Sequence, residues 1–150
     1  MKGIYDVGIV FRGFVIVNNV FKEFPIGKDS ESKRDLRGAF ISAISSFAES
    51  AFTNNHLEYL ESEKFLFIFK MGEIKSKDNH KSEPIILYGL TDKKKKNPNK
   101  TIRKFLGKAE LILESFIQKF DDKDFTEINQ FQPFKNELQD YFIKKQENIA

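Results

Sequence analysis

The residues of this sequence whose types could carry chemistry are two histidines, a set of carboxylates and a run of lysines. His56 and His80 are the only histidines, and neither has a second histidine three or four positions away. General acid–base catalysis needs such a group to lie beside a positioned partner. Both histidines also fall in or next to polar stretches that indicate loops. We therefore interpret them as surface residues without a catalytic role.

A group of carboxylates resembles part of a calcium-binding loop. Asp121, Asp122, Asp124 and Glu127 lie close together, but the glycine and the distal glutamate of such a loop are missing. The 8 glycines are scattered and form neither of the common phosphate-binding loops. The absence of cysteine excludes thiolate zinc sites and cysteine nucleophiles. We expect no catalytic residue, no metal site and no cofactor, and hence no enzymatic activity.

The lysine run is the strongest local charge feature. Cationic residues lie between a predicted strand end and the first turns of a predicted helix, namely Lys93, Lys94, Lys95, Lys96, Lys100, Arg103 and Lys104. Positive charge at a helix N-terminus opposes the helix dipole, which favours an anionic partner. Three interpretations remain open: a solvated loop, contact with phosphate or acidic lipid, and contact with an acidic protein surface.

An uncharged stretch is the second candidate surface. Between Arg37 and Glu49 lie 11 residues without a charge, in a chain of which 31% is charged. Apolar residues three and four positions apart predict a helix over Asp35–Phe52 with one apolar face, which packs on a sheet. This apolar face consists of Leu36, Phe40, Ala43, Ile44, Phe47, Ala48 and Ala51. We predict that the outward side is a protein interface formed by Arg37, Gly38, Ile41, Ser42, Ser45, Ser46 and Glu49. The alternative is that another part of the same chain covers this side.

The elements that position these residues follow the order strand, strand, helix, three strands, two helices. β-Branched and aromatic runs predict strands at Tyr5–Phe11, Phe14–Phe21, Leu57–Leu60, Lys64–Met71 and Ile85–Thr91. Apolar periodicity predicts the later helices at Thr101–Phe120 and at about 133–147. Arg12 and Gly13 separate the first two strands as in a tight hairpin, with Gly13 supplying a positive φ. Gly72–Glu83 is predicted to be a mobile loop.

One hairpin, one helical crossover and one meander predict an α+β fold with a five-stranded antiparallel sheet. If the crossover returns to the starting edge, the strand order is 2-1-5-4-3, with one helix on one face and the two C-terminal helices on the other. The 150 residues suffice for a single domain over 1–150, with its core at about 4–120. The charge of +3 is too small to attract nucleic acid to the molecule as a whole. Charged residues interrupt the apolar N-terminus, so it is neither a signal peptide nor a membrane span, and we expect a cytoplasmic protein without an integral membrane segment.

The element order resembles that of the longin domain. The amino-acid sequence from Leu36 to Ala48, followed by that of Leu66-Phe67-Ile68-Phe69-Lys70, is similar to the sequences of longin- and roadblock-like proteins seen in archaea. Roadblock proteins place a helix before the first strand, whereas only four residues precede Tyr5 here, so the longin order fits better. The resemblance implies a non-enzymatic protein-interaction module that self-associates or binds small GTPases and trafficking or regulatory partners.

The expected partner is therefore a second copy, a longin- or roadblock-like protein or a small GTPase, and nucleic acid is not expected. Arg12 or Arg37 could in principle reach a nucleotide bound to such a GTPase. The alternative function is a small basic adaptor that binds nucleic acid or anionic phospholipid through Lys93 to Lys104. Added salt should abolish that binding but should hardly affect an apolar helix interface.

Overall fold

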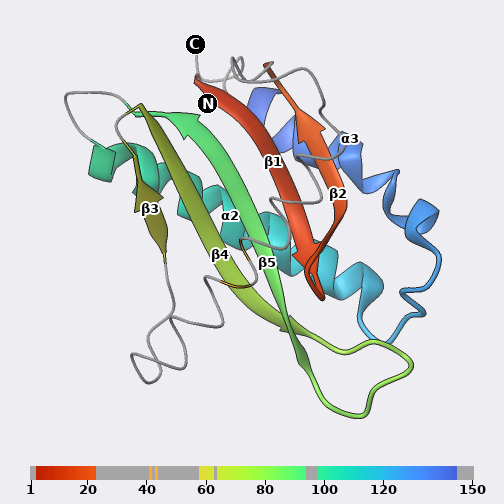
Figure 1. The fold of residues 1–150 in the computed structure, drawn as a ribbon. Coiled ribbons are helices and arrows are strands. Elements are labelled where there is room, and N and C mark those ends of the chain that lie inside the picture. The colour runs from red at the N-terminus through yellow and green to blue at the C-terminus, as the bar shows by residue number, and fades with distance from the viewer. Residues whose placement is uncertain are drawn as a thin grey trace.

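The computed structural model of the chain describes residues 3–22, 41, 43, 58–62, 64–93 and 98–144. Its strands are β1 (Ile4–Phe11), β2 (Phe14–Val20), β3 (Tyr59–Glu61), β4 (Phe65–Ile74) and β5 (Glu83–Asp92). They form one antiparallel sheet in the order β2-β1-β5-β4-β3 (Figure 1). This confirms the predicted α+β class and strand order.

The β1–β2 hairpin forms at the predicted turn. Phe11 pairs with Phe14 across Arg12 and Gly13, which have φ of 52° and 81°. Positive φ at both central residues gives the turn a twist that matches that of the strands. Glycine adopts this conformation at no steric cost, whereas Arg12 is held in it by contacts described below.

The β4–β5 hairpin is longer than the sequence predicted. β4 continues through Gly72 to the buried Ile74, and β5 begins at Glu83, one residue before Pro84. A Cβ on Gly72 would lie 3.0 Å from Leu113, so the missing side chain lets a helix pack closely on this part of the strand. The expected loop over Gly72–Glu83 is thus reduced to residues 75–82, hereafter the β4–β5 loop.

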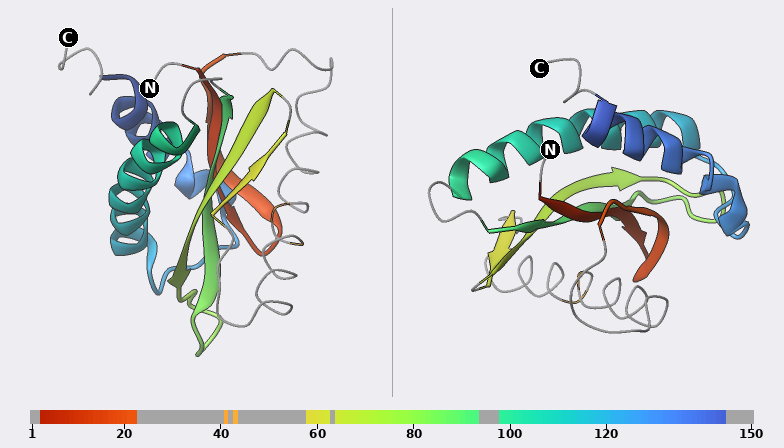
Figure 2. Two further views of the ribbon diagram at one scale, coloured as in Figure 1. Left: turned by 90° about the vertical axis from the view of Figure 1, so that its left-hand side faces the viewer. Right: turned by 90° about the horizontal axis from the view of Figure 1, so that it is seen from above.

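One face of the sheet is covered by the C-terminal part of the chain. The long helix α2 (Pro98–Phe120) lies across it, and η1 (Ile128–Phe131), α3 (Phe134–Gln139) and η2 (Asp140–Lys144) lie beside α2 (Figure 2). Phe105 of α2 sits on Gly89 of β5, where a Cβ would approach its ring to 2.2 Å. The predicted second and third helices are therefore present: the third corresponds to α3 and the directly following η2, and the short η1 precedes it.

The opposite face carries a smaller apolar cluster. Val10, Val15, Phe69, Ile86 and Tyr88 from four strands pack there with Ile41, which is helical and fully buried. All eight residues of β1 are buried, so both faces of this strand are covered. Apart from 41 and 43, the predicted helix over Asp35–Phe52 lies outside the described residues.

Candidate functional site

The predicted helix interface needs one correction. Ile41 was expected to face outward, but it packs on the sheet and is 0% exposed, whereas Ala43, expected on the apolar face, is exposed. Residues two positions apart in a helix point in nearly opposite directions, so these two observations agree with each other. The larger apolar side chain takes the buried side because it removes more apolar surface from water. The other predicted members, namely Arg37, Gly38, Ser42, Ser45, Ser46 and Glu49, lie outside the described residues.

The predicted anion-binding region is divided. Lys93 forms an ion pair with Glu61, with 2.7 Å between Nζ and Oε1, and its backbone N–H donates to the Lys64 carbonyl. Lys94, Lys95 and Lys96 lie outside the described residues. Lys100, Arg103 and Lys104 are exposed on the first turns of α2, whose first turn has no acidic residue. Three of the seven predicted residues thus share one exposed surface at the start of this helix.

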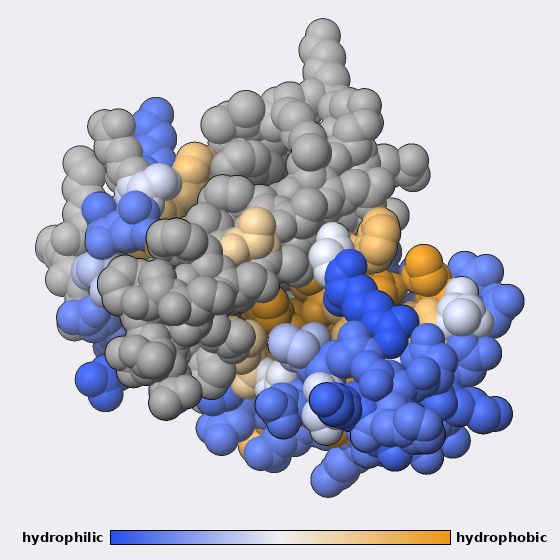
Figure 3. Space-filling model, turned by 60° about the horizontal axis from the view of Figure 1, so that its bottom comes forward, coloured by the Kyte–Doolittle hydropathy of each residue, from blue (hydrophilic) through white to orange (hydrophobic). Residues whose placement is uncertain are grey.

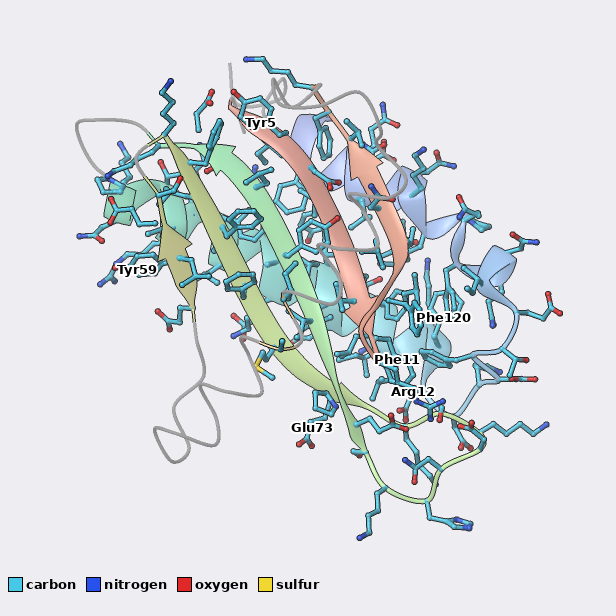
Figure 4. The ribbon with its side chains drawn as sticks, viewed as in Figure 1. Tyr5, Phe11, Arg12, Tyr59, Glu73 and Phe120 are labelled. Atoms are coloured by element: carbon cyan, nitrogen blue, oxygen red, sulfur yellow. The ribbon has the colours of Figure 1, made fainter. Side chains whose placement is uncertain are left out.

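A cluster around Arg12 is the most elaborate polar arrangement among the described residues. The Arg12 guanidinium donates to both carboxylate oxygens of Glu83, at 2.7 and 2.5 Å, and to Asp78 at 3.1 and 3.3 Å. It also donates to Ser76 Oγ and lies 4.9 Å from the centre of the Phe11 ring. Figure 4 shows Arg12 at the hairpin tip above the β4–β5 loop, and Figure 3 shows hydrophilic side chains gathered at this end.

The Arg12 cluster is a structural clamp in the observed arrangement. Hydrogen bonds from Arg12 hold the pKa of Glu83 and that of Asp78 below their usual values, and the two carboxylates raise the pKa of Arg12. The guanidinium of Arg12 is thus engaged by two carboxylates of the same molecule. The sequence carried one signal for this cluster, an arginine at a hairpin tip together with acidic residues in a neighbouring loop.

A buried aspartate was missed by the sequence analysis. Asp6 is 2% exposed, and its carboxylate accepts hydrogen bonds from Tyr88 Oη at 2.8 Å and from Asn18 Nδ2 at 3.1 Å. Gly8 is paired with Tyr88 on one side and with Asn18 on the other. A Cβ on Gly8 would lie 2.6 Å from the Tyr88 ring, so the glycine makes room for both donors to reach Asp6. A charged residue within a run of buried strand positions is the signal that could have identified this group.

The carboxylates after α2 have structural contacts. Asp121 accepts a hydrogen bond from the backbone N–H of Lys75 at 2.8 Å, and the backbone N–H of Asp122 donates to the Lys75 carbonyl. Asp124 caps the following turn by accepting hydrogen bonds from Thr126, which lowers its pKa. Glu127 is exposed. These contacts fasten the β4–β5 loop to the end of α2.

Neither histidine contributes to an assembled site in the described part of the chain. His80 is exposed in the β4–β5 loop, and His56 lies outside the described residues. Within the described ranges, no three histidine, aspartate or glutamate side chains are grouped so that they could hold a metal ion. None of the helices in those ranges combines the length and apolar character needed to cross a membrane.

Comparison with known proteins assigns no family. No protein-family model matches the chain, and no curated protein is significantly similar to it.

Proposed function

We propose that this chain is a non-enzymatic, cytoplasmic protein-interaction module of the longin type. Its partner would be a second copy, a longin- or roadblock-like protein, or a small GTPase in a trafficking or regulatory assembly. The observation that carries the proposal is the strand order β2-β1-β5-β4-β3, formed by a hairpin, a crossover and a meander. That order, together with the sequence resemblance between Leu36 and Lys70, is the basis of the longin analogy.

The surface proposed for this function is the side of the crossover helix that faces away from the sheet. The burial of Ile41 removes this residue from the surface, and the exposure of Ala43 adds another small residue to it. Ser42 and Ser46 remain proposed members of the interface, whereas Ser45, one helical turn after the buried Ile41, is expected on the sheet side. Small uncharged side chains allow a partner's backbone to approach closely, which a face built of lysine and glutamate would prevent.

The test is capture of partners from native lysate by the tagged chain, followed by mass spectrometry. We expect a small GTPase or a longin- or roadblock-like protein to be enriched, and we expect Ser46→Glu, on the side of the exposed Ala43, to reduce its recovery at least about tenfold. Lys135→Glu, on the exposed side of α3, is the control for an added negative charge. Equal recovery by the wild type and Ser46→Glu would contradict the proposed surface.

A second measurement addresses nucleotides directly. Calorimetry of the purified chain with GTP and with ATP should show no binding, and any change in hydrolysis rate should require an added GTPase. Micromolar binding of either nucleotide to the isolated chain would overturn the proposal.

The alternative is a small basic adaptor that binds nucleic acid or anionic phospholipid. The exposed Lys100, Arg103 and Lys104 favour it, whereas the engagement of Lys93 by Glu61 leaves less charge for such a ligand. Binding to RNA or to phosphatidylserine vesicles should then fall steeply between about 50 and 200 mM salt. A triple change of Lys100, Arg103 and Lys104 to Glu should abolish it.

A further inference from the structure

The outward face of α2 has an unusual charge pattern. The helix buries Ile102, Phe105, Ala109, Ile112, Leu113 and Phe116 against the rest of the protein. On the other side an exposed row runs along the helix, namely Lys100, Arg103, Lys104, Gly107, Glu110, Leu111 and Glu114. Figure 2 shows α2 lying on one face of the sheet with α3 beside it.

Charge is segregated along this row, with the cations in the N-terminal half and the carboxylates in the C-terminal half. Lys100 and Lys104 lie four positions apart, as do Glu110 and Glu114, and like charges at that spacing repel each other in a helix. Lys100 in the first turn also opposes the helix dipole, which favours acidic residues near the N-terminus. A single copy of α2 therefore carries its charges in an unfavourable order.

Two central residues of the row are not paired with opposite charges. The residues three and four positions after Arg103 are Leu106 and Gly107, which are uncharged. The same two residues lie four and three positions before Glu110. The ion pairs of the described residues include neither Arg103 nor Glu110. Each is exposed and available to a group from outside the molecule.

Opposite charges lie at similar distances on the two sides of Gly107. Arg103 is four positions before it and Glu110 three positions after it, and Lys100 and Glu114 are each seven positions away. If a second α2 is laid antiparallel on the first with a two-fold axis at Gly107, Arg103 faces Glu110 of the second copy. Lys100 then faces Glu114 of the second copy, and the symmetry produces every pair twice. The antiparallel arrangement also places the first turn of each helix, with Lys100, beside the acidic C-terminal half of its partner.

The centre of the row is shaped for close approach. No atom lies within 4 Å of a Cβ built on Gly107, so the space above this residue is open. Glycine is unfavourable inside a helix, and no neighbour among the described residues requires it here. Beside it, Leu111 is 49% exposed and would pack on the aliphatic stem of Lys104 from the second copy.

We propose that the outward face of α2 is the interface of a symmetric antiparallel homodimer centred on Gly107. This surface is separate from the proposed interface on the crossover helix and does not depend on the longin analogy. A contact between two helices is smaller than a standard protein interface, so the dimer is weak and forms at high protein concentration. Its exposed ion pairs make it sensitive to salt.

The test is sedimentation equilibrium of the full chain at low salt with a charge-swap series. We expect the wild type to dimerise, and we expect Arg103→Glu and Glu110→Arg each to weaken dimerisation roughly tenfold or more, because each places like charges face to face twice. The double variant Arg103→Glu/Glu110→Arg should restore it. Lys135→Glu makes the same change of charge as Arg103→Glu on α3 and should leave dimerisation unchanged.

Three results would overturn the proposal. The first is a wild-type monomer at millimolar concentration, and the second is a dimer that neither single variant weakens. The third is a double variant that stays as weak as the single ones, since only facing charges are rescued by exchange. Circular dichroism of each variant separates these results from loss of fold.

Discussion

The tip of the β1–β2 hairpin is joined to the β4–β5 loop by a single side chain, that of Arg12. Its contacts are with Ser76, Asp78 and Glu83, more than 60 positions away in the sequence. Such a contact restricts two loops at once, and it also accounts for a non-glycine residue at positive φ, since the guanidinium is fixed from the other end.

Arg12→Ala should reduce stability in a pH-dependent way. Pairing lowers the pKa of Glu83 and Asp78 in the folded state, so the stabilisation is complete above their unfolded pKa of about 4 and is lost as the pH falls through the folded values. We expect a loss of about 1 kcal/mol at pH 7, because these ion pairs are partly exposed. Urea denaturation at pH 7 and pH 3 measures this. The difference from wild type should be smaller at pH 3 than at pH 7, and Lys81→Ala in the same loop should show none at either pH.

Gly89 and Gly107 should respond in opposite ways to the same substitution. Gly89→Ala places a methyl group against the Phe105 ring, and the overpacking should destabilise the protein by about 1–3 kcal/mol. Gly107→Ala meets open space in a helix interior and should stabilise it by about 0.5–1 kcal/mol. Chemical denaturation compares the two. A stabilising Gly89→Ala would show that α2 does not lie closely on β5.

Single residues differed in how well the sequence predicted them. The positive φ of Gly13 followed from local turn chemistry, which a short stretch of sequence contains. The Arg12 cluster and the Asp6 group depend on residues that only the folded sheet brings together, so no local pattern specified their partners. The position of Ile41 was mistaken because several small and apolar residues follow one another in that helix, and its periodicity allows more than one buried face.

At the scale of elements, alternation and helical periodicity predicted the strands and α2 within a few residues. The extension of β4 to Ile74 was missed because Gly72 and Glu73 interrupt the apolar run, and the reason for the glycine lies in the helix above it. The C-terminal helix predicted at about 133–147 corresponds to α3 and the directly following η2, and η1 lies just before it. Phe131 of η1 and Phe134 of α3 pack on Phe116 and Phe120 of α2.

The lysine run should be dispensable for folding. Only Lys93 has a described ion pair, and both it and Glu61 are partly exposed, so the pair contributes little. Replacing Lys93, Lys94, Lys95 and Lys96 together with Ser should therefore leave the melting temperature within about 5 °C of wild type. Differential scanning calorimetry measures this. A much larger loss would mean that the run makes structural contacts, and it would remove the argument for a separate binding function.

At the scale of the whole molecule, the sheet is enclosed from both sides. β1 and most of β5 are buried along their length, and the larger cluster under α2 and the smaller one under Ile41 are separated only by the sheet. A strand with apolar residues on both faces needs two covering layers, which is what the alternation of Phe67 and Phe69 with Leu66 and Ile68 predicted. Ile41, which packs in the smaller cluster, is therefore expected to contribute to folding, on the side opposite to the proposed interface.

Two substitutions should separate the packing of the crossover on the sheet from the interface proposed on its outer side. Ile41→Asp would bury a carboxylate among Val10, Phe69 and Tyr88, and it should destabilise the protein by about 4 kcal/mol or more. Ala43→Asp introduces the same charge on the exposed side and should change stability by less than about 0.5 kcal/mol. Denaturation followed by circular dichroism distinguishes them. If both variants were equally stable, the crossover would not be part of the cooperative core. A loss of association in Ile41→Asp alone would then be an effect on the interface and not on folding.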